Sequence, residues 1–163
     1  MRKLDYIPRT NLKMIHVEGA YSFGIDSILL ADFAKMKRNK KLLDIGAGNG
    51  ILSMMANSLY NLSEVFAVEI QDKKAKILEK NLRLNSIENI KIINKDLNDI
   101  DFPINSLDYI ITNPPYYKYE GNIANKDEEF LISRQEIYLT LDHIFAFANK
   151  TLKDKGKLFM IHK

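Results

Sequence analysis

Five short apolar runs, separated by longer stretches with helical spacing, dominate the sequence from residue 41 onward. Runs rich in β-branched and aromatic residues that alternate with amphipathic helices are typical of βαβ units, in which helices cover both faces of a parallel sheet. The sequence therefore predicts an α/β fold with an open, mostly parallel sheet. The expected strands are residues 41–45, 64–70, 89–94, 107–113 and 156–162.

The helical spacing of apolar residues predicts the segments that cover this sheet. Asp72 is expected to cap one helix at its amino end, and Gly156 to end another, because glycine readily adopts the conformation that follows a helix. A polar loop over residues 116–130 is long enough to indicate a functional or disordered segment. The expected helices are residues 23–36, with Asp26 near the start, 51–60, 72–85, with Ile77, Leu78 and Leu82 on the inner face, and one from about Arg134.

Length and composition favour one cytoplasmic domain that spans residues 1–163, with 1–19 as an N-terminal tail and 20–163 as the core. The chain has 163 residues, of which 46% are hydrophobic and 28% charged, and it has no cysteine. No apolar stretch approaches the roughly 18 residues that cross a bilayer, and the first residues lack the apolar region of a signal peptide. The three histidines show no ligand spacing, so we expect no metal site.

A glycine loop follows the first predicted strand. Gly46, Gly48 and Gly50 allow a tight turn and a close approach of a ligand to the backbone. A dinucleotide fingerprint would place a small residue at position 51, which is Ile51, and Asp44 does not suit a nearby pyrophosphate. The pattern instead favours a positively charged nucleoside that carries an amino acid, such as S-adenosylmethionine.

Acidic residues follow the next two predicted strands. The carboxyl ends of parallel strands meet at one edge of the sheet, where open α/β sheets bind their ligands. Glu69 is expected there to accept both hydroxyl protons of a ribose, and Asp96 to accept from an adenine amino group with Leu97 against the ring. The alternatives are that Glu69 is an ordinary strand end and that Asp96 is an ordinary turn residue.

The segment N-P-P-Y, residues 113–116, ends the fourth predicted strand at the same edge. A planar amino group is a poor nucleophile, because its lone pair is delocalised. We expect the side-chain oxygen of Asn113 and the carbonyl of Pro114 to accept hydrogen bonds from such a group, while Tyr116 stacks on its ring. The alternative is a rigid turn without chemistry.

The motifs "DIGAGNG", "VEI", "NKDL" and "NPPYY", in this order, resemble those of Rossmann-like S-adenosylmethionine-dependent methyltransferases. N-P-P-Y is typical of members that methylate a planar nitrogen, either in nucleic-acid bases or in the glutamine of release factors. The segments around residues 21–34 and 133–163 are more narrowly similar to the bacterial family that methylates an adenine beside the anticodon of valine tRNA. That resemblance implies a flipped adenine as substrate and contacts from Phe23 and Asp26 with the methionine end of the cofactor.

Relative to that family the chain is short, because the family continues after the fifth strand with a helix and an antiparallel strand pair. We therefore expect these C-terminal strands to be absent and the exposed edge of the last strand to favour self-association or low stability.

Three functions remain open at this point. The first is methylation of an adenine amino group in RNA, with tRNA as the expected partner. The second is methylation of a protein glutamine, and the third is a truncated module that binds cofactor or RNA without turnover. Basic clusters in the N-terminal tail and in residues 35–41 and 72–83 modestly favour a nucleic acid, although each cluster by itself is also compatible with a solvated surface.

Overall fold

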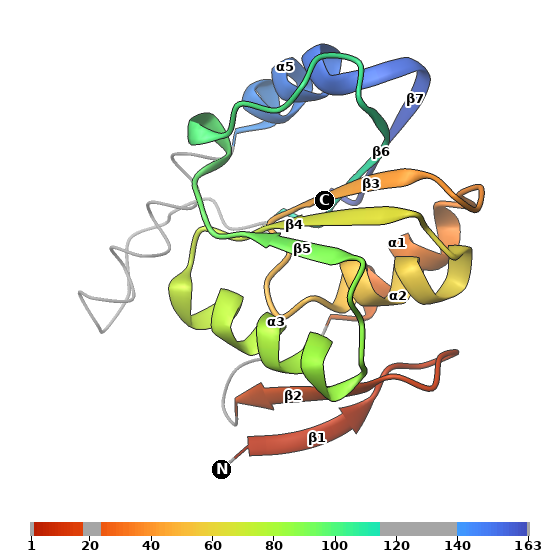
Figure 1. The fold of residues 1–163 in the computed structure, drawn as a ribbon, viewed down its shortest axis with the longest axis vertical. Coiled ribbons are helices and arrows are strands. Elements are labelled where there is room, and N and C mark those ends of the chain that lie inside the picture. Colours follow the sequence, from red (N-terminus) through yellow and green to blue (C-terminus); the bar gives the residue numbers. More distant parts are fainter. Residues whose placement is uncertain (1, 18–23, 115–139, 163) are drawn as a thin grey trace.

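The computed structural model describes residues 2–17, 24–114 and 140–162, and its centre is a five-stranded parallel sheet. The strand order is β5-β4-β3-β6-β7, so the prediction of a parallel α/β sheet is confirmed (Figure 1). The strands are β3 (Lys41–Ile45), β4 (Glu64–Val68), β5 (Ile90–Ile93), β6 (Leu107–Thr112) and β7 (Leu152–Met160).

Helices cover both faces of the sheet (Figure 1). Neighbouring residues of β3 alternate between the two layers, since Leu42 packs into one core cluster and Leu43 into the other. This explains why the strands are continuously apolar instead of alternating with polar residues. One layer contains α1 (Ile25–Phe33), α2 (Ile51–Tyr60) and α3 (Asp72–Leu84), and the other contains α5 (Leu141–Thr151).

None of the described helices has the length and hydrophobicity of a membrane-spanning segment.

The segment that the sequence analysis treated as a tail contains a β-hairpin, formed by β1 (Arg2–Tyr6) and β2 (Lys13–Val17). Its local signal is weak because the strands carry many charged residues, and α3 supplies the missing stabilisation. Asn85, the C-cap residue of α3, accepts from the backbone N–H of Lys13 at 2.8 Å and donates to its carbonyl oxygen at 2.7 Å. These bonds thus satisfy backbone groups of β2 that do not pair with β1.

Two predicted helix boundaries were wrong. Gln71, not Asp72, is the N-cap of α3. The last helix ends at Thr151 and β7 begins at once, so Gly156 lies within β7. No glycine is needed at this helix end, because the backbone N–H groups of the loop before β6 bind the last carbonyl groups. The donors are Asn105, at 3.2 Å from the oxygen of Lys150, and Ser106, at 2.9 Å from that of Thr151.

Candidate active site at the carboxyl edge

The sheet reverses its strand order at β3, which lies between β4 and β6. The chain leads from β3 toward β4 and from β6 toward β7, which are opposite directions along the sheet. The crevice beyond the carboxyl ends of two such strands is the usual ligand site of open α/β sheets. The glycine loop, residues 46–50, follows β3, and Asn113 follows β6. We call this side of the sheet the carboxyl edge.

All three glycines of the loop have positive φ angles, of 73° at Gly46, 58° at Gly48 and 93° at Gly50, but their surroundings differ. A Cβ on Gly50 would overlap with Cδ1 of Leu78, so this glycine is required where the loop packs against α3. A Cβ on Gly46 would meet no atom within 4 Å. At Gly48 a Cβ would meet only the carbonyl oxygen of Gly46, at 4.0 Å, so the loop has room for a ligand at Gly46 and Gly48 but not at Gly50.

Glu69 holds the glycine loop in place. Its side chain is only 3% exposed, and Oε2 accepts from the backbone N–H of Gly48 at 2.7 Å. Oε1 accepts from the backbone N–H of Gln71 at 2.8 Å. Each carboxylate oxygen has a second lone-pair site, so the same group can still accept hydroxyl protons. The structure thus gives Glu69 a positioning role at the loop that the sequence did not reveal, and its contact with a ribose remains a prediction.

Asp44 lies beneath the loop and is fully buried. Ser53 of α2 donates its hydroxyl proton to Oδ2 at 2.5 Å, whereas Oδ1 has no hydrogen-bond partner among the described residues. Burial raises the pKa of Asp44 to about 7, the hydrogen bonds from Ser53 oppose this shift, and the charge of Glu69 adds to it. A buried carboxylate with an unpaired oxygen would be stabilised by a positively charged ligand.

Asp96 and Leu97 follow β5 in a short turn. Asp96 caps this turn, since its Oδ1 accepts from the backbone N–H of Asn98 at 2.9 Å and from its side-chain amide at 3.0 Å. Leu97 is 6% exposed and packs in the core cluster beside α5. The capping bonds account for Asp96 as a turn residue, and its predicted contact with an adenine remains a prediction.

One hydroxyl group contacts the side chain of Asn113, and another holds the residue before it. Thr112, fully buried, donates to the carbonyl oxygen of Ile45 at 2.8 Å and so ties the end of β6 to the end of β3. The side-chain amide of Asn113 then donates to Oγ of Ser27 at 3.0 Å. Ser27 is 6% exposed and lies in the first turn of α1, beside Asp26. Pro114 is buried, whereas Phe23 and Tyr116 lie outside the described residues.

Asn81 is a further residue of this region that the sequence analysis missed. It is fully buried on α3 and donates to the carbonyl oxygen of Asn49, in the glycine loop, at 3.0 Å. The same side chain accepts from the backbone N–H of Ile15 at 2.7 Å. The available signal was a polar residue on the apolar face of a helix, between Leu78 and Leu82.

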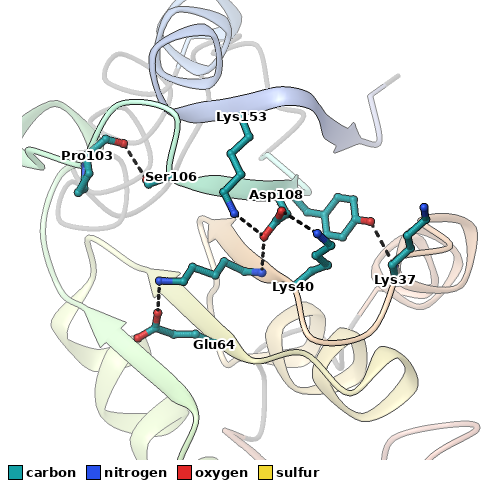
Figure 2. Close-up of polar contacts among 9 residues, drawn as sticks. Lys37, Lys40, Glu64, Pro103, Ser106, Asp108 and Lys153 are labelled. Carbon is teal, nitrogen blue, oxygen red and sulfur yellow. Dashed lines mark hydrogen bonds and ion pairs between the residues drawn. The ribbon is translucent and has the colours of Figure 1, made fainter.

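The opposite edge of the sheet carries ion pairs instead of a ligand site. Figure 2 shows Asp108 at the start of β6 with Lys40 and Lys153, whose ammonium groups lie 3.3 and 3.0 Å from its carboxylate. Although partial burial acts to raise it, the pKa of Asp108 is lowered by the backbone N–H of Lys41 and by these two cations. Across the described ranges, no group of three metal-ligating side chains is present.

A family model, "Methyltransferase small domain", matches residues 11–163. The curated relatives include a tRNA1(Val) (adenine(37)-N6)-methyltransferase of Aliivibrio salmonicida, 31% identical over 83% of this chain and 57% of its own length. Another is a release factor glutamine methyltransferase of Flavobacterium psychrophilum, 30% identical over 75% of this chain and 45% of its own. The chain thus spans about three fifths of the length of the tRNA methyltransferases that it matches.

Solved structures share the fold at low sequence identity. The chain is similar to M. jannaschii TYW2 in complex with AdoMet, with a TM-score of 0.64 and 19% identity over 94% of this chain and 59% of that one. It is also similar to geranyl diphosphate C-methyltransferase from Streptomyces coelicolor, with a TM-score of 0.65 and 17% identity over 85% of this chain and 45% of that one.

Proposed function

Because this chain belongs to the Methyltransferase small domain family, we propose that it transfers a methyl group from S-adenosylmethionine to the exocyclic amino group of an adenine in RNA, with tRNA as the substrate. The observation that carries this proposal is the anchored amide of Asn113 at the same edge as the glycine loop. A fixed amide beside a nucleoside site suits the methylation of a planar amino group, because the amide oxygen can accept hydrogen bonds from that group.

The residues around the glycine loop fit the cofactor. The open space at Gly46 admits a ligand, Glu69 retains acceptor sites for ribose hydroxyl groups, and Asp44 favours positive charge nearby. In the proposal, Gly48 and Gly50 complete the backbone around the ligand, Asp96 and Leu97 border the adenine, and Phe23 and Asp26 border the methionine end. When bound, S-adenosylmethionine supplies an electrophilic methyl group on a positively charged sulfur.

Asn113 and Pro114 act on the nucleophile. An exocyclic amine donates hydrogen bonds, and two fixed acceptors favour the growth of electron density on its nitrogen as the new bond forms. The side-chain oxygen of Asn113 and the carbonyl oxygen of Pro114 are these acceptors. Tyr116 stacks on the base, a contact that contributes roughly 1 to 3 kcal/mol. Alignment of the nitrogen with the methyl carbon supplies much of the acceleration, up to about 7 to 11 kcal/mol in well-oriented systems.

Adenine in tRNA is favoured over a protein amide by two observations. Several of the curated relatives are named as tRNA adenine methyltransferases, and the chain carries a net charge of +3 with clustered lysines. The glutamine alternative keeps the same chemistry, because a glutamine amide is also planar and one relative is named for that activity. A binding module without turnover is the remaining alternative.

Calorimetry with S-adenosylhomocysteine tests the cofactor site first, and absence of binding would contradict both enzyme hypotheses for this chain. Methyl transfer from labelled cofactor to unmodified total tRNA, ribosomal RNA or release factor then identifies the substrate. We expect labelling of tRNA. Asn113→Ala should reduce this transfer to a small residual rate while the dissociation constant of S-adenosylhomocysteine stays within about threefold. Equal loss of both would show that Asn113 is structural.

A further inference from the structure

Ser27 and Asn113 come from distant parts of the chain and meet at the carboxyl edge. The side-chain nitrogen of Asn113 lies 3.0 Å from Oγ of Ser27. Ser27 is 6% exposed and Asn113 is half-buried, so water reaches this contact less than it reaches a surface hydrogen bond. The bond therefore contributes to the orientation of the amide plane more strongly than an exposed hydrogen bond would.

Both partners are themselves fixed. The backbone N–H of Ser27 donates to the carbonyl oxygen of Gly24 at 3.0 Å in the first turn of α1, and Leu30 and Ala31 of that helix are buried in the core. On the other side, the bond from Thr112 to Ile45 holds the backbone directly before Asn113. The amide thus lies between a rigid strand end and a rigid helix start.

We propose that Ser27 is a positioning residue, whose hydroxyl oxygen accepts from the amide of Asn113 and thereby directs its carbonyl oxygen toward the target amino group. This inference rests on the proposed function. A serine hydroxyl can donate or accept, so it can bind the amide in either orientation. The target amine only donates while its nitrogen attacks, and it therefore selects the orientation in which Asn113 presents oxygen. In that orientation the amide NH₂ needs a buried acceptor, which Ser27 provides.

Removal of the hydroxyl tests this assignment. In Ser27→Ala, the amide NH₂ of Asn113 loses the hydroxyl oxygen that accepts from it in the productive orientation, so we expect kcat to fall about 10- to 100-fold. The KM for the cofactor and the dissociation constant of S-adenosylhomocysteine should change less than about threefold. Ser27→Thr keeps a hydroxyl group, so its kcat should be at least about tenfold higher than that of Ser27→Ala. Ser58→Ala removes an exposed hydroxyl from α2 and serves as the matched control, with unchanged kcat.

A double variant separates positioning from a general loss of structure. If Ser27 acts through Asn113, Ser27→Ala should cause no further loss of the residual rate in an Asn113→Ala background. An equal loss in both backgrounds would overturn the proposal, as would a kcat of Ser27→Ala equal to that of the original chain.

The contact also has a readout that needs no turnover. The side-chain NH₂ signals of Asn113 can be assigned in an NMR spectrum by their loss in Asn113→Ala. Their hydrogen exchange should accelerate at least about tenfold in Ser27→Ala, and an unchanged exchange rate would overturn the inference. If the original chain methylates none of the three substrates, the proposed function fails and takes the positioning role with it. The exchange experiment then shows separately whether the contact itself exists.

Discussion

The side-chain amide of Asn81 bridges the glycine loop and the N-terminal hairpin, with its nitrogen 3.0 Å from the carbonyl oxygen of Asn49 and its oxygen 2.7 Å from the backbone nitrogen of Ile15. The hairpin is therefore coupled to the proposed cofactor site, although it lies on the far side of α3 from the sheet (Figure 1). One buried amide satisfies backbone groups of two separate segments.

Asn81→Ala is expected to weaken both the fold and the cofactor site. The substitution leaves buried backbone groups unpaired, so the free energy of unfolding should fall by about 1 to 3 kcal/mol per unsatisfied group. The affinity for S-adenosylhomocysteine, measured by calorimetry, should fall as well. Asn85→Ala is the matched control, because Asn85 binds Lys13 of the hairpin but not the glycine loop. An equal loss of affinity in both variants would show that the loop depends on the hairpin as a whole and not on Asn81.

Substitutions at two glycines should separate packing from ligand binding. In Gly50→Ala the new methyl group overlaps with Leu78 at a positive φ of 93°, so a large fall in melting temperature is expected. In Gly46→Ala the methyl group enters open space at a φ of 73°, so the strain is about 1 to 2 kcal/mol while the ligand loses room. Calorimetry on folded protein should show a larger loss of affinity for S-adenosylhomocysteine in Gly46→Ala than in Gly50→Ala. Unchanged affinity of this variant would place the ligand elsewhere.

Glu69→Gln should weaken cofactor binding without unfolding the chain. The glutamine side chain retains one acceptor oxygen, so the backbone N–H of either Gly48 or Gln71 loses its partner, and hydrogen bonds to a ligand lose their charge assistance. One charge-assisted bond is worth about 1.5 to 3 kcal/mol, which predicts a roughly 10- to 100-fold higher dissociation constant for S-adenosylhomocysteine. Glu64→Gln, at the opposite edge, should leave this constant unchanged.

Asp44 should make stability depend on pH in an unusual direction. Its pKa is about 7 in the folded chain and about 3.9 in an unfolded one, so the folded state holds a proton that the unfolded state has released between about pH 4 and pH 7. The contribution of this group is therefore most favourable below about pH 4, falls as the pH rises through that window and is constant above it.

Asp44→Asn removes this dependence. Denaturant unfolding should be measured for Asp44→Asn and for the original chain at pH 4 and at pH 8. The free energy of unfolding of the variant, minus that of the original chain, should increase by about 4 kcal/mol between these two pH values. Asp108→Asn is the contrasting control, since the pKa of Asp108 is lowered and its contribution is lost at low pH instead. A difference for Asp44→Asn that does not vary with pH would contradict the raised pKa.

We propose that the outer edge of β7 supports self-association. In the portion of the chain that the structure describes, β7 is the last strand of the sheet and pairs only with β6. Lysines at positions 153, 155 and 157 of β7 oppose pairing of two such edges, and salt screens their repulsion. Sedimentation velocity should therefore show a dimer fraction that rises with salt concentration, whereas a monomer at every salt concentration would contradict the proposal.

Local patterns predicted most of the elements. The helix 51–60 was predicted with its observed bounds, and each of the five predicted strands overlaps an observed one. Errors arose where a contact from elsewhere in the chain replaces a local signal. Gly156 was expected to end a helix whose last carbonyl groups are bound by residues 105 and 106. The hairpin depends on Asn81 of α3 and on Asn85 at its C-cap.

From residue 41 onward, the sequence by itself determined the α/β class, the order of the strands and the residues that follow each strand, because apolar periodicity and glycine spacing act over short distances. Only the tertiary structure decided that Asp44 lies beneath the loop, that Glu69 binds Gly48, and that Ser27 contacts Asn113. These relationships join residues from different elements. They depend on the strand order and on the packing of α1 and α2, which no local pattern encodes.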